Sequence, residues 1–130
     1  MTPPPTVALR VLGAELAVCR LDPGAPVADP GGAELWALAR TEEETSVVCA
    51  LEDAPAGAKV EEGWMGFAVA GPLDFGLTGI LAAIAAPLAE AGVPIFAIST
   101  YDTDYVLLKR ADDDRARAAL TRAGHRFVDG

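Results

Sequence analysis

The polar side chains that could do chemistry gather in two short segments of the 130-residue chain, Asp74 to Gly79 and Ser99 to Asp104. Three carboxylates in these segments could in principle serve as general acid and general base; they are Asp74, Asp102 and Asp104. The only histidine, His125, lies far along the chain, and no Ser-His or Cys-His pair can be drawn. We therefore predict a non-catalytic binding site made from loop ends on a rigid scaffold.

The composition restricts the partners of such a site. The chain has 19 acidic and 10 basic residues and a formal net charge of −9, which argues against nucleic acid, because nucleic-acid binding needs a basic patch. No run of about 18 continuous apolar residues is present, so we predict no membrane span. Residues 1–6 have the character of a disordered lead-in without the features of a signal peptide, and a cytoplasmic location is the default expectation.

The two cysteines, Cys19 and Cys49, each lie within an apolar strand pattern. Such residues are more often small buried hydrophobes than partners in a disulfide or a redox site. Two cysteines and one histidine without ligand spacing do not make a metal site, so we predict neither a metal nor a cofactor.

A predicted helix follows the first polar segment. Its apolar stripe recurs at helical spacing and consists of Leu77, Ile80, Leu81, Ile84 and Leu88. Asp74 is a candidate N-cap, and Gly92 is a natural residue to follow the last turn, with Pro94 just beyond it. Pro87 removes one helical hydrogen bond, so we expect a kink or an early tightening there.

Strands and a second helix complete this half of the chain. The predicted strands are Trp64 to Val69, Ile95 to Thr100, Asp104 to Lys109 and His125 to Val128, and a second helix begins at Asp112. The order strand, helix, strand, strand, helix, strand is the ferredoxin-like split βαβ arrangement, with both helices on one face. His125 follows the second helix, where we expect a favourable charge–dipole contact with the helix C-terminus.

The first half has a similar number of strands but no comparable helix. The predicted strands are Val7 to Leu12, Glu15 to Leu21, Leu35 to Ala39 and Ser46 to Leu51, and a loop is predicted from Glu52 to Gly63. Thr41 to Glu44 fits a capping box and starts at best one helical turn. We predict an α+β fold with a lead-in over 1–6, an N-terminal module over 7–62 that is a diverged copy of the second half, and a C-terminal module over 63–130.

Several fragments resemble a known family. LDFGLTGIL at 73–81 and ISTYDTDYVLLK at 98–109 look like the C-terminal half of small bacterial ACT-domain proteins, which are related to the CASTOR amino-acid sensors and to the regulatory domains of aspartate kinases. RTEEETSVVC at 40–49 and LRVLGAELAVCRLDP at 9–23 resemble the N-terminal half. The resemblance covers about Val7 to Val128. It implies tandem ferredoxin-like ACT domains, no catalysis, a homodimer, and an amino acid held at an interface between ACT units.

Carried over by position, the resemblance places the ligand contacts in three groups. They are Asp74, Leu77, Thr78, Gly79 and Ile80 at the start of the first helix; Thr100, Tyr101 and Asp104 at the hairpin; and Pro94 and Ile95 from the facing unit. A helix start suits the ligand's carboxylate, Asp104 suits its ammonium, and Tyr101 offers an aromatic face to its side chain. Asp74 and Leu77 differ from the sensors' residue types, so the resemblance does not identify that side chain.

Each of these residues also has a purely structural interpretation. Asp74 would then be an N-cap, the glycines at 76 and 79 would serve helix packing or a turn, and Asp104 would stabilise the hairpin. In that case the alternative function is a protein–protein assembly module whose sheet edges pair across chains without a small-molecule ligand. In either case the sequence names no downstream protein partner.

Overall fold

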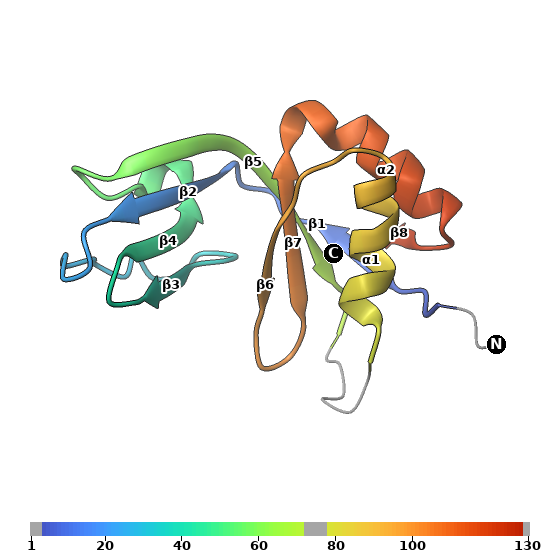
Figure 1. Cartoon of the computed structure of the whole chain (residues 1–130), viewed down its shortest axis with the longest axis horizontal. Helices are drawn as coiled ribbons and strands as arrows, with labels where there is room; N and C mark the ends of the chain where they lie inside the picture. The colour runs from blue at the N-terminus through green and yellow to red at the C-terminus, as the bar shows by residue number, and fades with distance from the viewer. Residues whose placement is uncertain (1–3, 72–77, 129–130) are drawn as a thin grey trace. The chain divides into compact units, whose positions relative to one another are not determined.

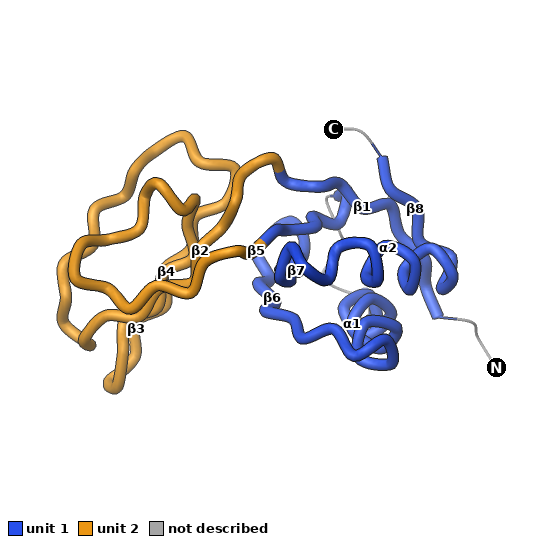
Figure 2. The backbone as a smooth tube through the Cα atoms, turned by 90° about the horizontal axis from the view of Figure 1, so that it is seen from above, with its two compact units in different colours: residues 1–12, 65–130 blue, residues 13–64 orange. Residues whose placement is uncertain are grey.

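The computed structural model describes residues 4–71 and 78–128 (Figure 1). The chain divides into two compact units, coloured separately in Figure 2. Unit 1 combines residues 1–12 with 65–130, and unit 2 is the intervening segment 13–64.

The sheet of unit 1 has the strand order β6-β7-β5-β1-β8 within the described residues. Its strands are β1 (Ala8–Val11), the C-terminal part of β5 (Lys59–Val69), β6 (Phe96–Ser99), β7 (Asp104–Lys109) and β8 (Arg126–Val128). Leu9 of β1 lies opposite Val69 of the antiparallel β5 and opposite Phe127 of the parallel β8. The predicted strand–helix–strand–strand–helix–strand order is therefore present, and β1 is added to it between β5 and β8.

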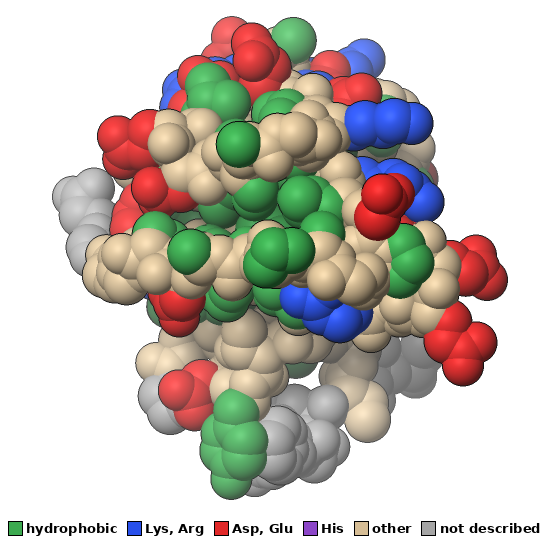
Figure 3. Space-filling view, turned by 90° about the vertical axis from the view of Figure 1, so that its left-hand side faces the viewer, with side chains coloured by type: hydrophobic (Ala, Val, Ile, Leu, Met, Phe, Trp, Pro, Cys, Tyr) green, Lys and Arg blue, Asp and Glu red, His purple; other side chains and the backbone are tan. Residues whose placement is uncertain are grey.

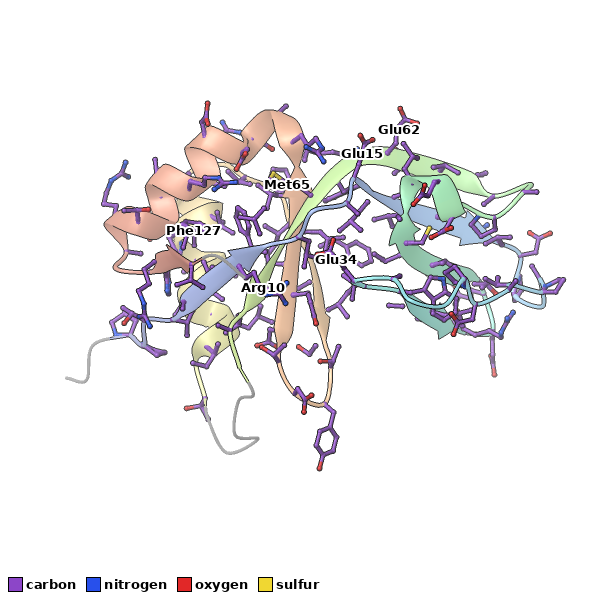
Figure 4. The ribbon with its side chains drawn as sticks, turned by 180° about the vertical axis from the view of Figure 1, so that it is seen from behind. Arg10, Glu15, Glu34, Glu62, Met65 and Phe127 are labelled. Atoms are coloured by element: carbon purple, nitrogen blue, oxygen red, sulfur yellow. The ribbon has the colours of Figure 1, made fainter. Side chains whose placement is uncertain are left out.

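Two helices complete unit 1, α1 (Ile80–Glu90) and α2 (Asp113–Arg122), the second preceded by a 3-10 turn, η2 (Arg110–Asp112). Alternate residues of the central strands form one core with the inner faces of both helices; the largest are Leu9, Phe67, Val106, Leu108, Ile84, Leu88 and Leu120. Met65 and Phe127, labelled in Figure 4, belong to this core or pack against it. The apolar residues that alternate along the strands and those that recur at helical spacing thus pack together in one core.

The polar helix α2 is held on the sheet by Arg117. Its Nε donates to the Asp113 carboxylate at 2.6 Å, and its guanidinium lies 5.3 Å from the centre of the Phe127 ring and 5.7 Å from that of Phe67. The two rings meet edge to face, 5.1 Å apart. A cation stacked on aromatic rings at the edge of a core lets a charged helix cover an apolar sheet.

Helix α1 continues through Pro87 for three more residues. A proline has no N–H to donate to the carbonyl four residues earlier, here that of Ala83. That carbonyl instead accepts a hydrogen bond from His125 Nε2 at 2.9 Å, because the buried ring reaches it from just beyond α2. The helix ends at Glu90, and Gly92 follows its last turn as predicted, with a φ of 75°, while the Val93 N–H donates to the Leu88 carbonyl.

Unit 2 is described throughout and contains no α-helix. Its strands are β2 (Leu16–Leu21), β3 (Ala37–Arg40), β4 (Thr45–Ala50) and the first part of β5, in the order β3-β4-β2-β5, with a 3-10 turn, η1 (Leu51–Asp53), after β4. The predicted turn of helix at Thr41 is instead the β3–β4 hairpin: the Thr41 hydroxyl accepts hydrogen bonds from the N–H groups of Glu43 and Glu44. The interpretation of this segment as a diverged ferredoxin-like copy stays a prediction.

The core of unit 2 is built from small side chains. Ala17, Cys19, Val47 and Cys49 are at most 1% exposed and share one face of the β2–β4 pair. Burial raises the pKa of the Cys19 thiol, and it raises that of Cys49 to about 12. Both cysteines are free thiols, in agreement with their interpretation as small buried hydrophobes. In Figure 3, hydrophobic side chains gather in the middle of one face of the molecule, with acidic ones around them.

A polar cluster fixes the long loop of unit 2. Arg40 Nη1 donates to the carbonyls of Pro23 and Ala25, both at 3.0 Å, and to the Thr45 hydroxyl at 2.7 Å. The fully buried Thr45 donates in turn to the Pro23 carbonyl at 3.2 Å. The start of the loop after β2 is therefore held by hydrogen bonds, in addition to the packing of Val27 against the core of unit 2.

The two units differ from the expected modules in two places. The strand expected to open the N-terminal module pairs in unit 1, where the Leu12 N–H also donates to the Gly66 carbonyl at 2.9 Å. The segment before Trp64, expected to be a loop up to Gly63, already belongs to β5 from Lys59 and pairs with β2. Gly63, with a φ of 84°, lies where the register between β2 and β5 shifts. This β-bulge lets β5 continue without a break from Lys59 to Val69.

Candidate functional site

The predicted polar hairpin between β6 and β7 is an ordered turn. The Thr100 N–H donates to the Thr103 carbonyl at 2.8 Å, and the Thr100 hydroxyl also bonds to the backbone of Thr103. The Thr103 hydroxyl donates to the Val69 carbonyl at the end of β5, 2.7 Å away. These bonds tie the backbone of the turn to the neighbouring strand β5 of unit 1, so the turn has a defined conformation.

Asp104 is half-buried at the start of β7 and lies opposite Ser99 in the strand register. The Ser99 hydroxyl donates to one Asp104 oxygen at 2.6 Å. A ligand ammonium would therefore share this carboxylate with Ser99 and find it already oriented. Tyr101, at the tip of the turn, is 80% exposed, which suits contact with something outside the described chain.

The start of α1 lies at the same end of unit 1 as the hairpin tip (Figure 1). Its N-cap is Gly79 in the left-handed conformation, with a φ of 80° and no side-chain cap. Thr78 and Gly79 are exposed, while Ile80 packs partly into the core. The other two predicted residues of this group, Asp74 and Leu77, lie outside the described residues.

Pro94 and Ile95 lie beyond the other end of α1. An 11-residue helix is about 16 Å long, so within one chain they are distant from Gly79. Pro94 is exposed and Ile95 packs against the core. The structure thus places the hairpin and the helix start at the same end of unit 1, and Pro94 and Ile95 lie at the other end of α1.

A feature that the sequence reasoning missed is a cavity of 480 Å³ on the outer side of α1. Its wall consists mainly of the small residues of α1 from Gly79 to Pro87, together with Pro5, Ala123 and His125. Of the predicted ligand contacts that the structure describes, Gly79 alone lines it. Only the position of His125 just after the second predicted helix could have drawn attention to this side of α1.

His125 itself is buried, and its partners rule out the charge–dipole contact expected from the sequence. Its Nδ1 accepts from the Val7 N–H at 3.2 Å and its Nε2 lies 2.9 Å from the Ala83 carbonyl. A ring that accepts through one nitrogen and donates through the other is neutral. The histidine therefore connects segments of unit 1 rather than stabilising the end of α2 by charge.

Other classes of site are not found in the described part of the chain. No group of three or more metal-ligating side chains occurs within residues 4–71 and 78–128. None of the described helices is long and apolar enough to cross a membrane.

Comparison with known proteins assigns the family. A family model of the ACT domain matches residues 59–122, which run from β5 to the end of α2. The chain belongs to the ACT-domain proteins. This confirms the resemblance found in the sequence, and it places β1 and β8 of unit 1 outside the matched ACT segment.

Solved structures support this assignment of the ACT fold. Protein Atu0741 from Agobacterium tumefaciens is similar over 97% of this chain and 95% of its own, with 31% identity and a TM-score of 0.87. The regulatory subunit of aspartate kinase from Thermus flavus shares the fold over 94% of this chain and 99% of its own, at 12% identity and a TM-score of 0.60. Protein VC0802 from Vibrio cholerae, described as of unknown function, is similar over 86% of this chain and 85% of its own, with 22% identity and a TM-score of 0.69. No curated protein matches the sequence.

Proposed function

We propose that this ACT protein is a non-catalytic regulatory protein that binds a free amino acid between ACT units of two copies of the chain. The observation that carries the proposal is the Ser99–Asp104 pair, a carboxylate oriented by a 2.6 Å hydrogen bond at the end of unit 1 where α1 starts. The fold shared with an aspartate kinase regulatory subunit supports the regulatory part of the proposal.

The proposed site binds the two charged groups of the amino acid at two different places. The first N–H groups of α1 have no side-chain cap and lie at the positive end of the helix dipole, where a carboxylate is stabilised. Asp104 takes the ammonium. The exposed Tyr101 packs on the ligand's side chain.

A second copy would supply the remaining contacts. In the described chain β6 pairs with β7 alone, which leaves the other edge of this four-residue strand available for a strand of another chain. Pro94 and Ile95, just before β6, would then face the ligand held by the partner. The assembly-only alternative keeps this edge pairing and has no ligand.

Calorimetric titration of the chain with the twenty amino acids, pooled and then singly, tests the proposal. Asp104→Ala should abolish the heat of binding, whereas the matched variant Ser99→Ala, which removes the same hydrogen bond but keeps the carboxylate, should weaken binding by about tenfold or less. The dimer, measured by sedimentation, should survive in both variants. A folded dimer that shows no binding heat with any amino acid favours the assembly-only alternative.

A further inference from the structure

His125 is 3% exposed and joins segments of unit 1 that lie far apart in the sequence. A carbonyl can only accept, so the 2.9 Å contact with Ala83 requires the proton on Nε2. The Val7 N–H can only donate, so the 3.2 Å contact requires Nδ1 without a proton. One tautomer of the neutral ring satisfies both partners.

The acceptor on α1 exists because of Pro87. In an uninterrupted helix the residue at position 87 would donate its N–H to the Ala83 carbonyl. Proline cannot, so the histidine supplies the donor that this partly buried carbonyl lacks within the helix. Pro87 and His125 are thus two parts of one arrangement, although 38 positions separate them in the printed sequence.

The N-terminal segment from Pro4 to Val7 is the part held by this arrangement. The Pro5 ring lies against the start of α1, where a Cβ placed on Gly79 would be 3.8 Å from it. The Thr6 methyl lies so close to Gly124 that a Cβ there would be 3.0 Å away. The Arg126 N–H donates to the Val7 carbonyl at 3.1 Å, and the ring of His125 takes the Val7 N–H.

We propose that His125 is a proton-sensitive latch that holds residues 4–7 against α1 and releases them when the ring gains a second proton. The protonated ring carries N–H groups on both nitrogens, so the Val7 N–H loses its acceptor and faces another donor. The charge would also be created in a buried position.

The charged groups near the ring do not compensate for this loss. On α1 the one charged residue is Glu90, which lines the same 480 Å³ cavity and is exposed. The cavity wall contributed by the N-terminal segment and by the end of α2 consists of Pro4, Pro5 and Ala123, and carries no charge. Arg122 lines the neighbouring 280 Å³ cavity together with Glu90.

Nuclear magnetic resonance of the full chain tests the latch. The ring nitrogen shifts report the tautomer, and the exchange protection factor of the Val7 amide reports the hold on the segment. When the ring gains its second proton on acidification, we expect protection of Val7 to fall roughly five- to tenfold, the effect of losing one hydrogen bond, with the same midpoint as protonation of the ring. The Val93 amide, which donates to Leu88 at the far end of α1, should keep its protection.

The variant His125→Gln keeps an uncharged N–H donor at every pH of the titration, so its Val7 protection should not change with pH. Pro26→Ala, an exposed proline in unit 2, serves as a matched control and should behave as the parent chain does. If the glutamine variant does not fold, the parent chain alone decides, because ring and amide are observed in the same sample. The latch is wrong if Nδ1 carries the proton at neutral pH, if the ring stays neutral to pH 4 in the folded chain, if it protonates without a change at Val7, or if Val7 and Val93 lose protection together.

Discussion

The two units of this ACT protein are stabilised in different ways. Unit 1 buries large side chains such as Phe67, Ile84 and Leu120 under two helices, whereas the buried cluster of unit 2 consists of alanine, valine and cysteine with larger apolar side chains only partly buried against it. Burying a large side chain contributes about 1.5–3 kcal/mol, so unit 1 depends mainly on apolar area. Unit 2 adds to its smaller apolar cluster the hydrogen bonds of Arg40 and Thr45. The comparison shows that a unit without helices can supplement a small apolar core with buried polar contacts.

The largest expected effect is in the core of unit 1. Phe67→Ala removes a ring that is fully buried and packs edge to face on Phe127, so the free energy of unfolding should fall by about 3–5 kcal/mol. Urea denaturation followed by circular dichroism measures this loss. The matched control is Val60→Ala on the same strand, where the side chain is 41% exposed and the change should stay within about 0.5 kcal/mol. Similar losses for the two variants would contradict the assignment of the core.

An intermediate effect is expected in unit 2. Thr45→Val keeps the shape of a fully buried side chain but removes the hydroxyl that bonds to Arg40 and to the Pro23 carbonyl, at a cost of about 1–3 kcal/mol. Amide exchange should accelerate across β2 and β4 and remain unchanged at Leu108 in unit 1. Thr121→Val, an exposed threonine of α2, is the control. Faster exchange throughout both units would show that they do not respond separately.

The smallest effect at neutral pH concerns the thiols of unit 2. The folded pKa of Cys49 is raised to about 12 from 9.0, so above pH 9 the unfolded chain releases this proton while the folded chain retains it. Stability from this group is therefore complete below pH 9 and is lost as the pH rises toward 12. Denaturation midpoints of Cys49→Ala should depend less steeply on pH in that range than those of the parent. A native chain alkylated at pH 8 as fast as the unfolded chain would contradict this burial.

Local patterns predicted most of unit 1. The spacing of Ile80, Ile84 and Leu88 predicted the buried stripe of α1, and Gly92 predicted its end, because both signals arise within one turn of helix. The pairing of β1 with β5 and β8 could not be predicted in this way, because strands that pair at long sequence separation carry no sequence pattern that identifies their partner. The charged start of β5 looked like a loop because a strand exposed on one side tolerates polar residues.

The candidate site was predicted less completely than the fold. The hairpin residues Ser99, Thr100 and Asp104 lie together as their clustering suggested, since a tight turn joins neighbours in sequence. The role of His125 was missed because its partners, Val7 and Ala83, are distant in sequence and are backbone atoms, which any residue type provides. Whether Asp74 and Leu77 take part stays a prediction.

The hydrogen bond from the Leu12 N–H to the Gly66 carbonyl has a consequence for engineering. The chain leaves unit 1 after Leu12 and re-enters it at Met65, on two neighbouring antiparallel strands. Residues 13–64 are therefore an insertion in the connection between β1 and β5. Deleting residues 13–64 and joining Leu12 to Met65 by a tight turn would keep the pairing of β1 with β5 and β8. The same junction could accept a foreign domain in its place.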